Sequence, residues 1–392
     1  MDAAINPFNP GAGTNPPELA GRADVLQQAT IALERVKRGR HAKSLVILGL
    51  RGVGKTVLLN EISSKAQQIG YLSEMIEARD SDDLRQILAY SMRRVLLELD
   101  RGKQTVDAVK KALRVLRSFL GKVKVSAGGI DVTLGIEPEI GLADSGQLEH
   151  DIADLLVEAG RAAKAVERPI ALLIDELQYV PKNELSALIR AIHAVNQAGL
   201  PLILFGAGLP QLAGQAGDAK SYTERLFDFP RLDRLGEADA FAAIRGPVEH
   251  EGAAIDENAL QEIFQQTRGY PYFLQEWGYN TWNICTTDRI NIEDVRLATD
   301  ISIRKLDESF FQVRFDRLTP GEREYMRALA SLGSEPQRTA VVATMLERKP
   351  QGVNPVRDGL IKKGMLYAPE HGMIAFTVPL FDEFMCRIMP PT

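Results

Sequence analysis

Short apolar runs alternate with amphipathic stretches through the first half of the chain. Runs rich in apolar residues, bounded by turn residues, predict strands at 44–48, 71–78, 169–174 and 201–205. Apolar residues with helical spacing predict helices over 24–37, 55–68, from about 81, 106–120, 148–165 and 183–195. Strand and helix in regular alternation predict an α/β domain built on a parallel sheet.

Two stretches break this alternation. Residues 120–145 contain two alternating segments, 122–126 and 131–136, around a Gly-Gly turn, and predict a hairpin insertion. Such a hairpin either contacts a partner or forms an edge of the sheet. Residues 236–306 show helical spacing only, and predict a separate helical domain.

A third kind of pattern occupies the C-terminal part of the chain. Thr319-Pro320-Gly321-Glu322 predicts a capped helix start, and further helices are expected over 339–346 and from Asn354-Pro355 to about Gly364. Two short strands, 365–367 and 373–376, flank a turn at Gly372. Three helices followed by a hairpin is the winged-helix order.

Composition narrows the class of protein. Of the 392 residues 45% are hydrophobic and 25% are charged, which excludes collagen-like, mucin-like and wholly disordered chains. The net charge of −5 means that nucleic-acid binding would need a local basic patch. Cys285 and Cys386 are too few and too far apart for a zinc site or a disulfide framework. Without a signal-peptide pattern or an apolar span, the sequence predicts a cytoplasmic protein with no membrane segment.

The strongest chemical signal follows the first strand. Gly49-Leu50-Arg51-Gly52-Val53-Gly54-Lys55-Thr56 matches G-x-x-x-x-G-K-[ST] in full, between a predicted strand and a predicted helix. Its glycines allow successive backbone N–H groups to face a phosphate, and the helix start adds a positive dipole end. We expect the backbone from Gly49 to Val57 to bind the nucleotide phosphates. Lys55 would stabilise the β- and γ-phosphates, and the Thr56 hydroxyl would ligate Mg²⁺.

An acidic pair ends the most apolar strand. Asp175 follows this strand directly, and we expect its carboxylate on a strand next to the phosphate loop, where it helps to hold Mg²⁺. Glu176 is the candidate base that polarises the attacking water. Together with the phosphate loop, this pair favours a hydrolase over a small-molecule kinase.

These residues resemble the AAA+ ATPase superfamily, and within it the origin-recognition-like and archaeal-type, STAND-related ATPases that carry a C-terminal winged helix. The resemblance covers about residues 16–390. It implies that Gly21-Arg22 lies near the adenine, that Gly269-Tyr270-Pro271 belongs to the helical lid, and that Arg225 reaches a γ-phosphate. Arg225 would act from a neighbouring subunit, which implies nucleotide-dependent homo-oligomers.

Two departures from the family pattern set limits on the activity. The strand that begins at Leu200 runs into Gly206-Ala207-Gly208, where AAA+ proteins usually place a polar residue that orients water. The helix after Pro271 begins Tyr272-Phe273-Leu274-Gln275 and lacks the arginine that many relatives use to sense the phosphate. Both departures predict slow hydrolysis, or a nucleotide switch in place of a processive motor.

The partner of the C-terminal domain stays open at this stage. Arg357, Lys362 and Lys363, with Asn354, lie on the third predicted helix, where a winged helix contacts duplex DNA. Residues 309–392 hold only a small basic excess, which also suits a protein partner.

The expected architecture has three parts. A P-loop NTPase domain of AAA+-like fold covers residues 1–235, with the hairpin insertion at 120–145. A helical lid covers 236–308, and a winged-helix domain covers 309–392. The expected function is a Mg²⁺-dependent ATPase whose nucleotide state controls the winged helix, associated with DNA. The alternative is an ATP-dependent regulatory switch of signalling or defence type that binds a protein.

Overall fold

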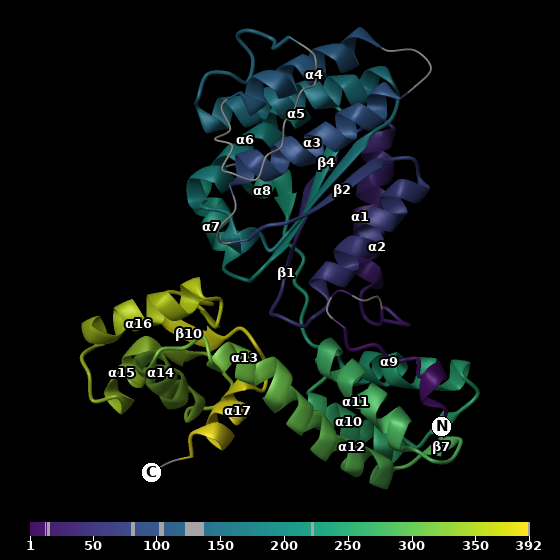
Figure 1. Ribbon diagram of the computed structural model, residues 1–392, viewed down its shortest axis with the longest axis vertical. Helices are drawn as coiled ribbons and strands as arrows, with labels where there is room; N and C mark the ends of the chain where they lie inside the picture. Colours follow the sequence, from purple (N-terminus) through teal and green to yellow (C-terminus); the bar gives the residue numbers. More distant parts are fainter. Residues whose placement is uncertain are drawn as a thin grey trace.

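Three bodies make up the molecule in the computed structural model (Figure 1). The structure describes residues 1–11, 13, 16–79, 83–101, 106–121, 137–220 and 223–390. An α/β domain lies at one end, and a helical lid and a C-terminal domain lie beside each other at the other end. The hairpin predicted within 120–145, with its segments 122–126 and 131–136, lies outside the described residues, as do Ser81 and Asp82.

A five-stranded parallel sheet forms the centre of the α/β domain, as the sequence predicts. Its strands are β1 (Ser44–Leu48), β2 (Leu72–Glu77), β3 (Ile170–Asp175), β4 (Leu202–Gly208) and β5 (Phe227–Asp228). Their order in the sheet is β2-β3-β4-β1-β5. The expectation that Asp175 lies on a strand next to β1 is wrong, because β4 is inserted between β1 and β3. The long helical crossovers of a parallel sheet permit this order, and the spacing of residues along the chain does not reveal it.

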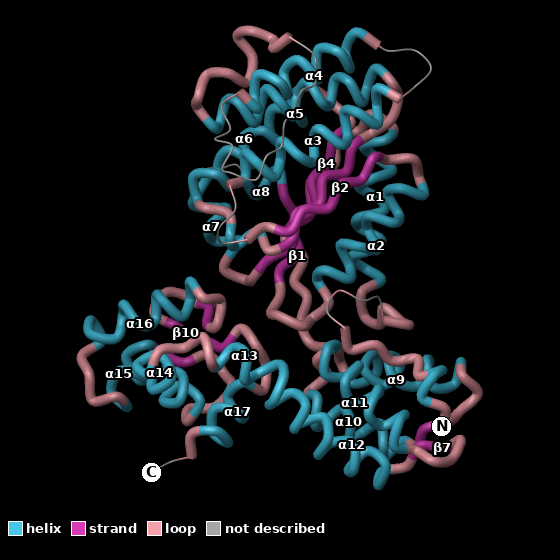
Figure 2. The backbone as a smooth tube through the Cα atoms, viewed as in Figure 1, coloured by secondary structure: helices cyan, strands magenta, loops and turns pink. Residues whose placement is uncertain are grey.

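Helices cover both faces of this sheet (Figure 2). One face is covered by α1 (Ala23–Lys37) and α2 (Lys55–Gln68). The other face is covered by α3 (Leu84–Asp100), α4 (Asp107–Leu120), α5 (Leu148–Ala165) and α6 (Lys182–Gln197). Successive strand residues point to opposite faces, so Leu45 and Ile47 join the first layer while Val46 and Leu48 join the second. Both layers are apolar, which explains why these strands form continuous hydrophobic runs.

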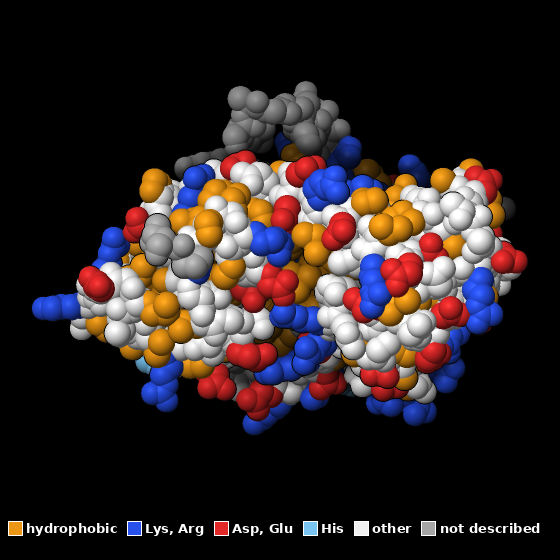
Figure 3. Space-filling view, turned by 90° about the horizontal axis from the view of Figure 1, so that it is seen from below, with side chains coloured by type: hydrophobic (Ala, Val, Ile, Leu, Met, Phe, Trp, Pro, Cys, Tyr) orange, Lys and Arg blue, Asp and Glu red, His pale blue; other side chains and the backbone are white. Residues whose placement is uncertain are grey.

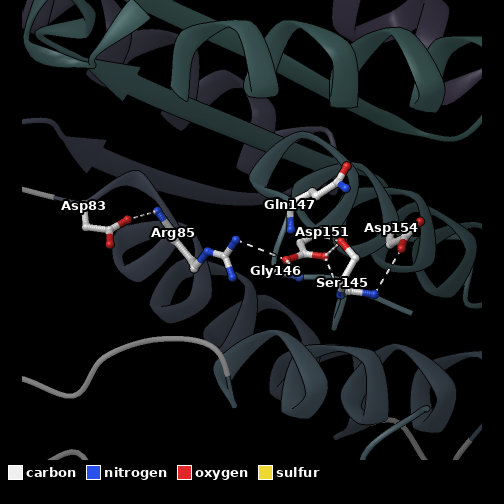
Figure 4. Close-up of polar contacts among 8 residues, drawn as sticks. Asp83, Arg85, Ser145, Gly146, Gln147, Asp151 and Asp154 are labelled. Carbon is white, nitrogen blue, oxygen red and sulfur yellow. Dashed lines mark hydrogen bonds and ion pairs between the residues drawn. The ribbon is translucent and has the colours of Figure 1, made fainter. Parts of the chain in front are cut away.

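A buried carboxylate fixes the start of α5 (Figure 4). Asp151 is fully buried and pairs with Arg85 of α3 at 3.1 Å. It also accepts hydrogen bonds from the backbone N–H groups of Ser145 and Gly146 and from the Ser145 hydroxyl. The Arg85 guanidinium lies 5.2 Å from the centre of the Phe119 ring. These contacts satisfy the buried charge and tie α3, α4 and α5 together.

Short elements complete the α/β domain and lead into the lid. They are η2 (Leu177–Tyr179), α7 (Leu212–Ala219) and α8 (Thr223–Leu226). The lid contains α9 (Glu237–His250), α10 (Glu257–Thr267), α11 (Pro271–Ile284) and α12 (Ile292–Lys305). The expectation of helices alone is wrong here, because β6 (Ala254–Ile255) pairs in parallel with β7 (Arg289–Ile290). Each strand has only two residues, too few to show an alternating pattern in the sequence.

The N-terminal segment packs on the lid. It holds a short turn of helix, η1 (Ala3–Ile5), and the buried Phe8. Gly278 of α11 makes room for Phe8, since a Cβ at this glycine would lie 2.7 Å from the Phe8 ring.

One continuous helix leads out of the lid. It comprises α12, the π-helical turn η3 (Leu306–Phe311) and α13 (Gln312–Phe315). Phe311 of η3 stacks on Phe384, with ring centres 5.3 Å apart, and contacts Phe381 edge to face at 5.6 Å. Through these rings the lid and the C-terminal domain share one hydrophobic core, separate from the two cores of the α/β domain.

The C-terminal domain contains the predicted helices and hairpin with two additions. Its elements are α14 (Pro320–Ala330), β8 (Gln337–Arg338), α15 (Thr339–Met345), α16 (Pro350–Lys362), β9 (Leu366–Tyr367), β10 (Met373–Phe376) and α17 (Phe381–Ile388). The added β8 pairs with β10, giving an antiparallel sheet of order β8-β10-β9.

Helix α16 starts earlier than the sequence analysis expects. Pro350 takes the first helical position, where a missing N–H costs nothing. Pro355, expected at the helix start, lies inside the helix and is exposed to solvent. The carbonyl of the exposed Gln351 loses its helical partner there and faces water, which makes this interior proline tolerable.

No helix within the described ranges is both long enough and apolar enough to cross a bilayer.

Candidate nucleotide-binding site

A pocket of about 300 Å³ opens where the phosphate loop, the N-terminal segment and the lid meet. These three segments and the helix that leads out of the lid supply most of its lining. The lining residues are Asn9, Pro10, Gly11, Gly13, Pro16, Glu18, Leu19, Ala20, Arg22, Arg51, Gly52, Val53, Gly54, Lys55, Thr56, Val57, Glu176, Leu235, Ala243, Pro271, Tyr272, Leu274, Gln275, Phe310 and Arg314. The lining combines the phosphate loop with small, apolar and a few charged side chains. Such a combination suits a nucleotide, which has phosphates for the loop and a base for apolar groups.

Glycine is required at several points of the loop. Gly52 and Gly54 have φ angles of +81° and +91°, in the left-handed region that other residues rarely adopt. Gly49 plays a different part, because it does not line the pocket. A Cβ there would lie 2.7 Å from both the Leu232 carbonyl oxygen and the Val53 side chain. The glycines thus allow both the turn of the loop and its close contact with the segment after β5.

Lys55 lies buried at the centre of the loop. Its ammonium donates hydrogen bonds to the carbonyls of Gly49 and Leu50, at 3.0 and 2.8 Å. Burial lowers the pKa of Lys55, and the carboxylates of Glu176 and Asp175 partly counter this effect. Two of its three N–H donors are engaged within the loop, and the third is available for an anion in the pocket.

Thr56 lines the pocket and contacts Asp175, which is buried and does not line it. The Thr56 hydroxyl donates to a carboxylate oxygen of Asp175 at 2.5 Å, although β4 separates β1, which leads into the phosphate loop, from β3, which ends at Asp175. Burial raises the pKa of Asp175, and the hydrogen bond from Thr56 acts against this shift. One hydroxyl and one carboxylate side by side, next to a phosphate loop, form a donor set that suits Mg²⁺.

Glu176 lines the same pocket in a strained conformation. Its φ of +55° is unusual for a residue with a side chain, and such strain is often found at functional sites. Gln178 holds the carboxylate by donating a short hydrogen bond to it, and accepts one from the Leu209 N–H at 3.1 Å. A Cβ at Gly208 would lie 2.9 Å from the Gln178 side-chain oxygen. The small residues that end β4 therefore make room for Gln178, a polar group that the sequence analysis overlooked.

Arg22 and Pro271 support the pocket from its walls. The Arg22 guanidinium donates to the carbonyls of Val53 and Asp233, at 3.1 and 2.7 Å. Burial lowers the pKa of Arg22, while Asp239 and Asp233 raise it. Arg22 therefore connects the phosphate loop to the segment that leads into the lid. Pro271 takes the first position of α11 and brings the lid against the loop, where the Tyr272 N–H donates to the Gly52 carbonyl at 3.2 Å.

The C-terminal domain also contacts the phosphate loop. The Arg51 N–H donates to the Thr377 carbonyl at 3.2 Å, and the Arg51 side chain donates to the Tyr179 hydroxyl at 2.5 Å. Gly364 faces the same point, since a Cβ there would lie 2.8 Å from the Arg51 guanidinium. A loop residue thus contacts both the segment after Glu176 and the domain more than three hundred residues later.

Arg225 lies elsewhere. It belongs to the short helix α8, is exposed to solvent and does not line the pocket of its own chain. Its action on a neighbouring subunit stays a prediction.

The three basic residues predicted to face DNA lie together on and just after α16, but differ in their surroundings. Lys362 is exposed. Arg357 pairs with its neighbour Asp358 at 2.7 Å, and Lys363 pairs with Glu322 at 2.6 Å and donates to the Arg317 carbonyl. Two of the three charges are therefore partly neutralised within the chain.

Several lining residues escaped the sequence analysis. No motif marks the N-terminal residues Asn9 to Gly11 or Gln178 in the sequence. Arg314 lies 263 positions after Arg51, in a segment without any motif. Only the three-dimensional arrangement of the lid and α13 brings it to the pocket.

Comparisons with known proteins agree with this geometry. Residues 18–205 match the family model described as an AAA ATPase domain, and residues 308–385 match one described as a domain of unknown function (DUF8462). No curated protein sequence matches the chain.

Solved structures support the same fold. The Walker-type ATPase PABY2304 of Pyrococcus abyssi is 14% identical, with a TM-score of 0.60, over 95% of this chain and 97% of that one. The RuvB Holliday junction branch migration motor of Thermotoga maritima is 17% identical, with a TM-score of 0.46 over 95% of both chains. The Orc1 protein of Aeropyrum pernix, in complex with DNA, is 14% identical, with a TM-score of 0.47 over 96% of this chain and 94% of that one. The last two scores are too low to support an argument.

The sheet order, the phosphate loop, the match over residues 18–205 and the similarity to the Pyrococcus ATPase together show an AAA+ P-loop NTPase-like fold. The predicted fold class is therefore confirmed, with a parallel-sheet core followed by helical domains.

Proposed function

We propose that this protein is a Mg²⁺-dependent ATPase whose nucleotide state controls the position of its C-terminal domain. The observation that carries the proposal is the contact between Thr56 and Asp175 beside the buried Lys55. The start of α2, after the phosphate loop, and the end of β3 meet there and bring together groups that suit a Mg²⁺-bound triphosphate. A glycine turn without a nucleotide-binding role would not be expected to lie beside a hydroxyl, a carboxylate and a buried ammonium that are close together.

The chain's own residues supply the chemistry of hydrolysis. The loop backbone and Lys55 bind the phosphates and stabilise the negative charge that develops as ADP leaves. Glu176 orients water for attack on the γ-phosphorus and accepts its proton. Thr56 and Asp175 would hold Mg²⁺, which would neutralise phosphate charge. Arg225, exposed on α8, completes the site of a neighbouring copy in nucleotide-dependent homo-oligomers.

The contacts of Arg51 support control of the C-terminal domain. Arg51 belongs to the loop that binds phosphate, and its N–H bonds to Thr377 of that domain. Movement of the loop or lid on nucleotide binding therefore changes a contact with the C-terminal domain directly. We also assign this domain as a winged helix, from its helix-strand-helix-helix-strand-strand order and its β8-β10-β9 sheet.

Hydrolysis by the purified chain tests the proposal. With Mg²⁺ the wild type should release phosphate from ATP slowly, and chelation of Mg²⁺ should stop the release. Lys55→Ala should weaken ATP binding about tenfold or more, and Glu176→Gln should retain binding but lower the rate by about 10² or more. Lys110→Ala and Glu335→Gln, at exposed positions, are matched controls. Full activity of Glu176→Gln would disprove the assigned base, and unchanged binding by Lys55→Ala would disprove the site.

Duplex DNA is a second candidate partner, favoured by the winged-helix order of the C-terminal elements. The pairing of Arg357 and Lys363 with carboxylates of their own chain favours a protein partner instead. Labelled duplex titrated at two salt concentrations, with ATP, with ADP and without nucleotide, separates the two. Affinity that falls steeply with salt and is lost in Lys362→Ala supports DNA, and no binding in any state assigns the domain to a protein partner.

A further inference from the structure

Arg314 lies in the nucleotide pocket although it belongs to α13, beyond the lid. Its guanidinium stacks 3.9 Å from the centre of the Phe310 ring and donates to the Phe310 carbonyl at 2.5 Å. Phe310 in turn stacks on Tyr272, with ring centres 4.9 Å apart. The Tyr272 N–H donates to the Gly52 carbonyl of the phosphate loop at 3.2 Å. An unbroken series of contacts thus fixes Arg314 relative to the loop.

Positive charge gathers around this point. Behind the nucleotide pocket lies a second cavity of about 240 Å³, which Arg51 and Arg314 line together with Arg317 and Lys363. Lys363 pairs with Glu322, but no carboxylate of the described residues forms an ion pair with any of the three arginines. Arg51 also has a buried Nε without a hydrogen-bond partner. Seen from below, basic and acidic side chains line the hollow between the C-terminal domain, at left, and the lid, at right (Figure 3).

This concentration of charge is unfavourable without an anion. Burial and the neighbouring Arg51 lower the pKa of Arg314 to about 10, because both disfavour its charged form. An anion between Arg51 and Arg314 would remove this penalty. Both arginines line the nucleotide pocket and Arg51 belongs to the phosphate loop, so that anion would lie beside the loop.

The lid helix cannot supply such a group itself. After Pro271 it presents Tyr272 and Gln275 to the pocket, and no arginine. Arg314 of α13 brings an arginine to the pocket instead, shortly after the π-helical turn η3 that carries Phe310. Turns of this kind are rare and occur often at functional sites.

We infer that Arg314 binds the terminal phosphate of ATP and so makes the chain distinguish ATP from ADP. The inference rests on the proposed nucleotide site. Arginine suits this role because its planar donors match phosphate oxygens and its charge is permanent. Since α13 connects the lid to the C-terminal domain, a phosphate bound at Arg314 draws that connection toward the loop. Loss of the terminal phosphate on hydrolysis allows α13 to move away from the loop again.

Calorimetric titration of the full chain with Mg²⁺ and either ADP or a non-hydrolysable ATP analogue tests the inference. For Arg314→Gln the affinity for the analogue should fall about tenfold or more, while the affinity for ADP changes less than about twofold. Arg304→Gln is the matched control, an exposed arginine on the same continuous helix. Arg314→Lys keeps the charge without the planar donors, and should show an intermediate loss for the analogue alone. If Arg314→Gln does not fold, the affinities of Arg314→Lys for the two nucleotides provide the test.

Equal losses for both nucleotides, or no loss for either, would overturn the role of Arg314. The proposed function is tested separately in the same experiment. If the wild type binds neither nucleotide, the nucleotide site itself is wrong. If the wild type binds both and Lys55→Ala binds neither, while Arg314→Gln behaves as the wild type, only the present inference fails.

Discussion

Gln178 determines, at the scale of single residues, where the Glu176 carboxylate points. It bridges Glu176 and the backbone of Leu209, just after β4. Gly208 leaves the space that the Gln178 side chain occupies. The resemblance to AAA+ ATPases leads us to expect a polar side chain at the end of β4, where this chain has Gly206-Ala207-Gly208, and Gln178 of η2 lies against Gly208. Gln178 is therefore a positioning residue for the proposed base.

Replacement of Gln178 should slow hydrolysis and spare binding. In Gln178→Leu the Glu176 carboxylate loses its donor and samples other directions, so we expect the rate to fall about tenfold or more. Affinity for the ATP analogue should stay close to that of the wild type. Gln197→Leu, at an exposed position at the end of α6, is the control. Phosphate release and calorimetry measure the two effects, and a parallel loss of binding would show that Gln178 only maintains the fold.

Glu322 illustrates how a single element, α14, is anchored. Its carboxylate accepts from the Thr319 N–H at 2.7 Å, closing the predicted capping box, and from Lys363 at 2.6 Å. Burial alone would raise its pKa, but the hydrogen bonds from Lys363 and Thr319 lower it below the ordinary value of 4.5. An acid whose pKa falls on folding stabilises the fold above its unfolded pKa, and this stability is lost as the pH drops through the folded pKa.

Glu322→Gln should therefore destabilise the protein in a pH-dependent way. Glutamine can still accept from Thr319, so the variant removes mainly the charge that faces Lys363. We expect a loss of about 1 kcal/mol in the free energy of unfolding at pH 7. The difference from the wild type should shrink once the pH falls below 4.5. Denaturant unfolding at both pH values measures it, with the exposed Glu324→Gln as control. If the difference in the free energy of unfolding is the same at both pH values, the charge of Glu322 is not its cause.

The sequence predicts whole elements better than it predicts how they meet. The core strands and capped helices were predictable because apolar runs and the capping box mark them locally. β8 and β6 were missed because two-residue strands show no alternation, and α17 carries no capping signal. The phosphate loop, Asp175 and Glu176 were recognisable as motifs. Gln178 and Arg314 were not, because the first depends on the space beside β4 and the second on a helix from another domain.

The whole molecule divides into two parts around the pocket. Aromatic contacts of Phe311 with Phe381 and Phe384 join the lid and the C-terminal domain into one core. The contacts of that unit with the loop include two backbone hydrogen bonds, from Arg51 to Thr377 and from Tyr272 to Gly52, and the close approach of Gly364 to Arg51. A large hydrophobic core favours movement as one body, whereas a small polar contact can break and re-form. Nucleotide between the two parts should therefore move the lid and the C-terminal domain together.

Hydrogen exchange of the full Glu176→Gln chain tests the central claim most directly. The chain is compared without nucleotide, with Mg²⁺ and ADP, and with Mg²⁺ and ATP. Both nucleotides should protect the backbone of residues 49–57, and exchange over residues 363–378 should differ between ATP and ADP. Protection of the loop with identical exchange over 363–378 in all states would contradict control of the C-terminal domain. The absence of any protection at the loop would contradict the nucleotide site itself.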